Sequence, residues 1–173
     1  MRKLIAIGLL IVSHNVRAEN PATWNLVEAI RQIEACPKEG SRTGHSRDGK
    51  CCLGDGGRAR GQWQFWPIAW KDVNNERARQ KLMTYSYDFA WKESHARVYA
   101  WDYLLLLRKR FVGREEREPT INELWAMWNV GYGTFFEKED DGGYGGDFEK
   151  CPHKTKMDGL RIELLLKTME GIR

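Results

Sequence analysis

Apolar residues recur at helical spacing in several segments of the chain, and the first of these begins shortly after residue 20. Val27, Ile30 and Ile33 are three residues apart, and Thr23 is a candidate N-cap, so we predict a helix from residue 23 to about 35. A second helix should begin at Pro67, because proline is favoured at the first helical position.

Three further helices are predicted in the rest of the chain. A long one should run from about residue 87 to 111. Its expected face comprises Ala90, Ser94, Val98, Trp101 and Leu105. Thr120 and Glu123 form a capping-box pattern, which predicts a helix that reaches Trp128. The last helix should run from about residue 158 to 169. Its apolar side comprises Ile162, Leu165, Leu166 and Met169.

The segments between these helices are rich in glycine and charge, notably residues 40–60 and 137–146. Such composition is typical of surface loops, and a small β-hairpin could lie within the first. We find no internal repeat and no linker that would divide the chain. The sequence therefore predicts one mainly α domain over residues 19–173.

The first 18 residues resemble a secretory signal peptide. A basic start at Arg2 and Lys3 precedes the apolar run Leu4–Val12, and Ala18 follows where a signal peptidase would cleave. The apolar run is far shorter than the roughly 20 residues that span a bilayer, so we expect no membrane anchor. The alternative is that this run is the first buried helix of a cytosolic protein. We expect an exported protein, periplasmic or extracellular.

Removal of this leader leaves the charge almost balanced. The chain has 28 basic and 24 acidic residues, and the leader takes three of the basic ones, which leaves 25 against 24. Nucleic-acid-binding proteins usually have a clustered basic face, so this balance argues against nucleic acid as a partner.

Four cysteines, Cys36, Cys51, Cys52 and Cys151, lie after the leader, and an even number in an exported chain suggests disulfides. A bond between the neighbours Cys51 and Cys52 would be strained, so we favour Cys36 with one of them and Cys151 with the other. A zinc site would need paired C-x-x-C spacing, which is absent. The histidines are scattered as well, so we expect no metal.

Glu34 is the first candidate for chemistry. It follows Val27 by seven residues and Ile30 by four, so it should share their face of the first helix. Partial burial and the unpaired carbonyl groups of a helix C-terminus both disfavour an ionised carboxyl group, as a general acid working near neutral pH requires. The alternative is a structural salt bridge or a solvated edge position.

Two later segments combine glycine with amide side chains. The first is Gly61-Gln62-Trp63-Gln64, followed by further tryptophans, and such aromatic faces and amides suit sugar rings. The second includes Asn129 and Gly131 at the end of the capped helix, with Tyr132 beside them. The alternatives are that the tryptophans fill the core and that Asn129 and Gly131 form an ordinary helix stop.

In this order, the segments resemble the soluble lytic transglycosylase and goose-type lysozyme superfamily. That superfamily combines a helix ending in Glu-Ser-Gly, a Gly-x-x-Gln segment and an Ala-Tyr-Asn-x-Gly segment. The corresponding segments here are residues 33–36, 61–64 and 127–131, and the resemblance extends over residues 24–133. It implies a lysozyme-like helical fold and cleavage of the β-1,4 bond between N-acetylmuramic acid and N-acetylglucosamine in peptidoglycan.

The resemblance also implies roles for individual residues. Glu34 would be the catalytic acid and base, and no cofactor would be needed. The residues expected to bind the glycan are Gln64, Asn129, Gly61, Gly131, Tyr132 and Trp63. In a transglycosylase the muramic acid 6-hydroxyl attacks, giving a 1,6-anhydro product. We expect a monomer that acts on glycan strands.

Departures from the superfamily pattern keep alternatives open. The serine that usually follows the catalytic glutamate is Ala35, and the tyrosine before the asparagine is Trp128. A lysozyme-type hydrolase would need a second carboxylate to position water, for which Asp48 and Asp55 are candidates, although each could be an ordinary loop aspartate. A catalytically inactive wall-binding module and a secreted effector or inhibitor are the remaining alternatives.

Overall fold

The computed structural model describes residues 21–34 and 58–171. The α-helices are α1 (Pro21–Glu34), α2 (Pro67–Arg79), α3 (Glu93–Glu115), α4 (Ile121–Asn129), α5 (Tyr132–Phe136) and α6 (His153–Gly171). The 3-10 helices are η2 (Tyr87–Trp91), η3 (Glu139–Asp141) and η4 (Phe148–Lys150). The prediction of a mainly α protein is confirmed, and the described ranges contain no strand. The predicted leader and most of the first long loop lie outside them.

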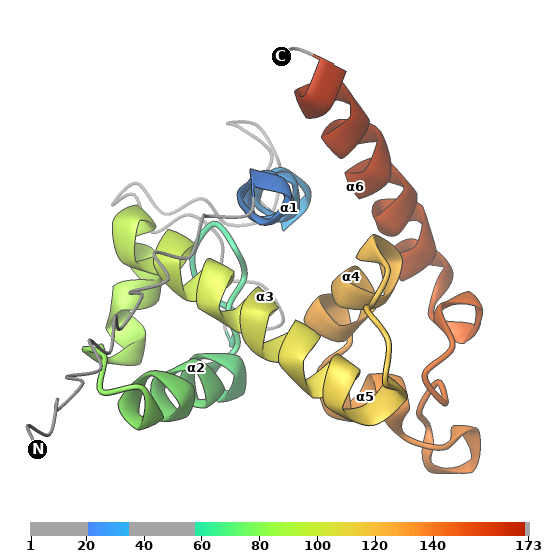
Figure 1. Ribbon diagram of the computed structural model, residues 1–173, viewed down its shortest axis with the longest axis horizontal. Helices are drawn as coiled ribbons and strands as arrows, with labels where there is room; N and C mark the ends of the chain where they lie inside the picture. Colours follow the sequence, from blue (N-terminus) through green and yellow to red (C-terminus); the bar gives the residue numbers. More distant parts are fainter. Residues whose placement is uncertain (1–20, 35–57, 172–173) are drawn as a thin grey trace, which may run out of the picture.

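Helix α3 crosses the centre of the molecule and contacts α1, α2 and α4 (Figure 1). Helix α6 packs along both α1 and α4, so the last helix closes the side of the fold where the first helix lies. Large aromatic side chains fill the space between these helices. Those that are almost completely buried include Trp63, Trp70, Trp125, Tyr99, Phe111 and Phe135.

The predicted helix starts at Pro67 and Thr120 are confirmed, and the predicted start at Thr23 is wrong. Pro67 is the first residue of α2. At α4, the Thr120 side chain accepts from the Glu123 backbone and the Glu123 side chain accepts from Thr120, which is the predicted capping box. At α1 the helix begins at Pro21, so Thr23 lies inside the first turn and is not the N-cap. Proline supplies the fixed φ that suits a first helical position.

The predicted long helix from residue 87 to 111 is two elements. Lys92 has an extended backbone (φ −88°, ψ 110°) and separates η2 from α3. The predicted face is also wrong in part, because Ser94 and Val98 are exposed. The buried residues of α3 are Ala96, Tyr99, Ala100, Tyr103, Leu104, Leu106, Leu107 and Phe111. Contacts with several neighbouring helices bury a broader and differently oriented surface than one apolar stripe.

Helix α6 begins five residues earlier than predicted, at His153, and it buries Ile162 and Leu166 as expected.

Cys151 lies just before α6 as a buried free thiol, so the predicted disulfide of Cys151 is wrong. Its sulfur atom instead lies 3.8 Å from the backbone carbonyl oxygen of Asp147. The other three cysteines lie outside the described residues. None of the described helices is both long and apolar enough to cross a bilayer.

Candidate functional site

A tight turn between residues 60 and 65 forms one wall of the candidate site. Arg60 and Phe65 pair as an isolated antiparallel bridge, with N–H···O distances of 2.9 Å in both directions. Within the turn, the Gln64 backbone N–H donates to the Gly61 carbonyl at 3.0 Å. The Arg31 guanidinium donates to the Gln62 side chain at 3.3 Å, so the last turns of α1 lie beside this turn.

The backbone of this turn is unusual at two residues. Gly61 has φ +73°, and a Cβ atom there would lie only 2.1 Å from the Ala90 carbonyl oxygen. Gln64 has φ +48°, a conformation that glutamine rarely adopts. Its side-chain amide donates to the Gly61 carbonyl at 2.8 Å, which helps to hold it there. Strained residues of this kind often occur at functional sites, because the surrounding structure must maintain them.

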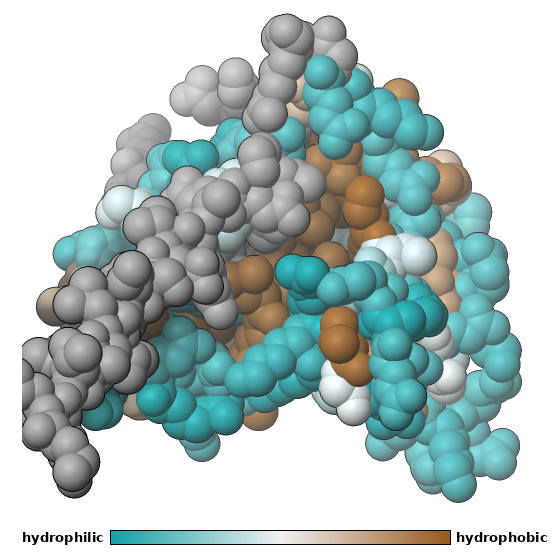
Figure 2. All heavy atoms as spheres, viewed as in Figure 1, coloured by the Kyte–Doolittle hydropathy of each residue, from teal (hydrophilic) through white to brown (hydrophobic). Residues whose placement is uncertain are grey.

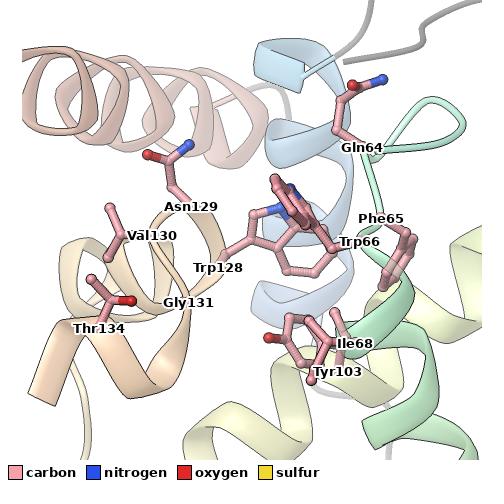
Figure 3. Close-up of a pocket in the computed structure, with 11 residues that line it drawn as sticks. Gln64, Phe65, Trp66, Ile68, Tyr103, Trp128, Asn129, Val130, Gly131 and Thr134 are labelled. Atoms are coloured by element: carbon pink, nitrogen blue, oxygen red, sulfur yellow. The ribbon is translucent and has the colours of Figure 1, made fainter. Parts of the chain in front are cut away.

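The opposite wall is the end of α4 and the turn that follows it. Asn129 is the last residue of α4, and Gly131 adopts φ +89° directly before α5. The Thr155 hydroxyl of α6 donates to the Asn129 side-chain oxygen at 2.7 Å. Thr155 is itself held by the Trp125 indole, which donates to its carbonyl oxygen at 2.8 Å. In Figure 3 the amide nitrogen of Asn129 accordingly turns toward the space beside α1.

These two walls enclose a pocket of about 300 Å³. Its lining residues are Gln64, Phe65, Trp66, Ile68, Ala69, Tyr103, Trp128, Asn129, Val130, Gly131 and Thr134. They come from the turn, the start of α2, the middle of α3 and the α4–α5 junction (Figure 3). Figure 2 shows hydrophobic residues gathered at the centre of one face of the molecule, with hydrophilic residues around them.

Three of the residues predicted to bind a glycan line this pocket together: Gln64, Asn129 and Gly131. Gly61 does not line it, but its carbonyl oxygen accepts the hydrogen bond from the Gln64 side chain. Glu34 is not a lining residue either. It is the last residue of α1 and is partly buried, as predicted from its spacing to the buried Val27 and Ile30. It therefore lies on the part of α1 that adjoins the turn.

Two other predicted site residues lie away from the pocket. Trp63 is only 1% exposed, and its indole N–H donates to the Val27 carbonyl at 2.9 Å, so its side chain is part of the core. Tyr132 packs against Phe136, and its hydroxyl lies 3.4 Å from the Arg110 carbonyl oxygen. Asp48 and Asp55 lie outside the described residues.

Aromatic rings make up much of the pocket surface. Trp128 lies edge-on to Phe65 and to Tyr103, with ring centroids 5.3 Å apart in both pairs. Trp66 also lines the pocket, and the Arg58 guanidinium carbon lies 5.4 Å from the centre of its ring. Half-buried indole rings beside amide groups provide apolar faces and hydrogen bonds at once, which is the combination that sugars require.

Sequence reasoning missed three polar residues of this region. Thr155 orients Asn129 from α6, while Tyr103 and Thr134 line the pocket directly. The sequence placed Tyr103 in a predicted long helix, and such a position equally predicts a core residue. Thr134 and Thr155 lie in segments with no distinctive pattern, so neither could be selected without the tertiary contacts.

Among the described residues, no three histidine, cysteine or acidic side chains are grouped as metal ligands. Comparisons of the chain with protein-family models, curated proteins and solved structures found no match.

Proposed function

We propose that this protein is an exported lytic transglycosylase that cleaves the glycan strands of peptidoglycan, with Glu34 as its acid and base. The observation that supports this best is the common pocket of Gln64, Asn129 and Gly131. These residues come from two segments that are distant in the chain, and both segments belong to the resemblance stated above.

The surroundings of Glu34 support the same proposal. The Arg31–Gln62 contact holds the final turns of α1 against the Gly61–Gln64 turn, so a glycan in the pocket would pass close to that end of the helix. Glu28, six residues earlier on α1, forms an ion pair with Arg31. The Arg31 side chain holds the pKa of Glu28 below its usual range, although burial acts in the opposite direction. A carboxyl group held ionised in this way is a poor general acid.

The proposed reaction needs one carboxyl group. Protonated Glu34 would donate its proton to the glycosidic oxygen as the bond from that oxygen to the muramic acid C1 breaks. The resulting carboxylate would then take the proton of the muramic acid 6-hydroxyl while the 6-oxygen bonds to C1. The sum of these steps is an intramolecular glycosyl transfer that consumes no water and restores the acid, and it leaves one product with a 1,6-anhydro end and the other with a free hydroxyl group. Gln64 and Asn129 would hold the sugar through their amide groups.

The test is mass spectrometry of the products released from purified peptidoglycan. We expect anhydromuropeptides from the native protein, and at least about a hundredfold less product from Glu34→Gln, because a positioned general acid contributes about that much or more. Glu28→Gln is the matched control, since it makes the same change on the same helix at a partly exposed ion pair that contributes little to stability.

Each alternative result has a separate meaning. Products with reducing ends would indicate a hydrolase and direct attention to Asp48 and Asp55. Equal losses in Glu34→Gln and Glu28→Gln would refute a specific role of Glu34. Absence of products from folded native protein that still binds the strands would favour a wall-binding module.

A further inference from the structure

The hydroxyl group of Tyr103 is an unexplained polar group in the pocket. Tyr103 is only 7% exposed, and its ring packs against Phe65 and Trp128. Its hydroxyl makes no hydrogen bond to any residue that the structure describes. Tyr103 lines the pocket, so its hydroxyl is available to a ligand group that enters there.

Tyr103 is a hydrogen-bond donor at every pH at which the protein would work. Burial raises the pKa of Tyr103 to about 12, and nearby Asp72 adds to this while Arg110 opposes it. The phenol therefore keeps its proton. It also cannot turn away easily, because its ring is fixed between two aromatic neighbours.

A second hydroxyl faces the first across the pocket. Thr134, on α5, lines the pocket and makes no side-chain hydrogen bond within the described ranges. In Figure 3 the hydroxyl groups of Tyr103 and Thr134 turn toward each other from opposite sides. Apolar surface from Phe65, Ala69 and Trp128 surrounds them. The pocket thus offers the hydroxyl groups of Tyr103 and Thr134 beside apolar surface, in addition to the amide groups of Gln64 and Asn129.

We propose that Tyr103 and Thr134 bind the acetamido group of an N-acetylated amino sugar. The Tyr103 hydroxyl donates to the carbonyl oxygen, the Thr134 hydroxyl oxygen accepts from the amide N–H, and the methyl group rests on the apolar surface. An acetamido group has one acceptor, one donor and one methyl, so it uses every feature of this space. A sugar hydroxyl in the same position would leave the apolar surface unfilled.

This inference rests on the proposed function for its choice of sugar polymer, but its test does not require catalysis. The pocket volume of about 300 Å³ is at the small end of ligand sites, which fits one sugar ring and its substituent. The two probes are chitotriose, which has acetamido groups, and cellotriose, which has hydroxyls in their place. Fluorescence of the pocket tryptophans would report binding of both to a protein that also contains Glu34→Gln, which prevents cleavage.

We expect chitotriose to bind more tightly than cellotriose. Tyr103→Phe and Thr134→Val should each weaken chitotriose binding about threefold to tenfold, the effect of one lost neutral hydrogen bond, and should leave cellotriose binding unchanged. Tyr85→Phe is the matched control, because Tyr85 packs against Phe89 and His95 and does not line the pocket. Thermal unfolding would verify that each variant folds.

Equal affinity for the two trisaccharides, or equal losses for both in the variants, would refute the acetamido site. The outcome for catalysis is separate. If the native protein cleaves peptidoglycan while the trisaccharides bind alike, the acetamido site is wrong and the enzyme proposal stands. If discrimination depends on Tyr103 and Thr134 but no products form, the acetamido site stands and the enzyme proposal fails.

Discussion

Replacement of Gly61 by alanine tests whether the turn beside the pocket is as tightly constrained as its geometry indicates. The added Cβ atom would lie 2.1 Å from the Ala90 carbonyl oxygen and 3.1 Å from its carbon. Both are backbone atoms of η2, so no side chain can rotate to relieve the contact. In addition, φ of +73° at this residue is a conformation that alanine adopts only at a cost.

The two effects can be separated by magnitude. The left-handed backbone costs an L-residue about 1 to 2 kcal/mol, and overpacking of a tight site costs about 1 to 3 kcal/mol more. Gly61→Ala should therefore destabilise the protein by about 2 to 5 kcal/mol. Gly145 is the matched control, because it has φ +60° and open space around its Cβ position. Gly145→Ala should cost only the first of these amounts.

Urea unfolding monitored by tryptophan fluorescence would measure the free energy of unfolding of both variants. An unchanged m-value would show that their unfolded states are comparable. A Gly61→Ala variant no less stable than Gly145→Ala would refute the argument that the contact with Ala90 fixes the turn. Because Gln64 is held by the Gly61 carbonyl, Gly61→Ala should also weaken chitotriose binding, whereas Gly145→Ala should not.

Three further predictions concern other contacts. Thr155→Val should lower the free energy of unfolding in urea by about 1 to 3 kcal/mol and reduce product formation, because the Asn129 side-chain oxygen loses its hydrogen-bond donor. Thr155→Ser keeps the hydroxyl group and should restore both the stability and the product formation. Burial raises the pKa of the Glu123 carboxyl group, but the hydrogen bond from Arg117 helps to hold this pKa below its usual value of 4.5. The ionised Glu123 side chain therefore stabilises the folded protein above pH 4.5, and this stabilisation is lost as the pH falls. The free-energy difference between native protein and Glu123→Gln should therefore shrink below about pH 4.5, and a difference independent of pH would contradict the ion pair. Burial raises the pKa of Cys151 to about 11, so a thiol reagent at pH 8 should label Cys151 only after unfolding; rapid labelling of native protein would contradict this environment.

Several local features were predictable because they depend on residues close together in the chain. The Thr120–Glu123 capping box and the start of α2 at Pro67 follow from rules that involve only a few neighbouring residues. The partial burial of Glu34 followed in the same way from helical spacing. Where the local signal was weaker, as at Thr23, the predicted boundary was wrong.

The predictions that were wrong concern features that depend on contacts between distant segments. The break at Lys92 and the buried surface of α3 result from packing against several helices at once, which no single periodic pattern describes. Likewise, whether Cys151 forms a disulfide depends on which residues lie beside it in the fold, and Cys151 is a buried free thiol.

The sequence by itself determined the helical class of the protein and the order in which a glutamate, a glutamine and an asparagine occur along it. Only the tertiary structure decided that Gln64 and Asn129 line one pocket, that Trp63 is in the core, and that the Tyr103 hydroxyl has no hydrogen-bond partner among the residues that the structure describes. The physical reason is that helix formation depends on interactions over three or four residues. A binding pocket depends on which side chains remain at the surface after all the helices have packed.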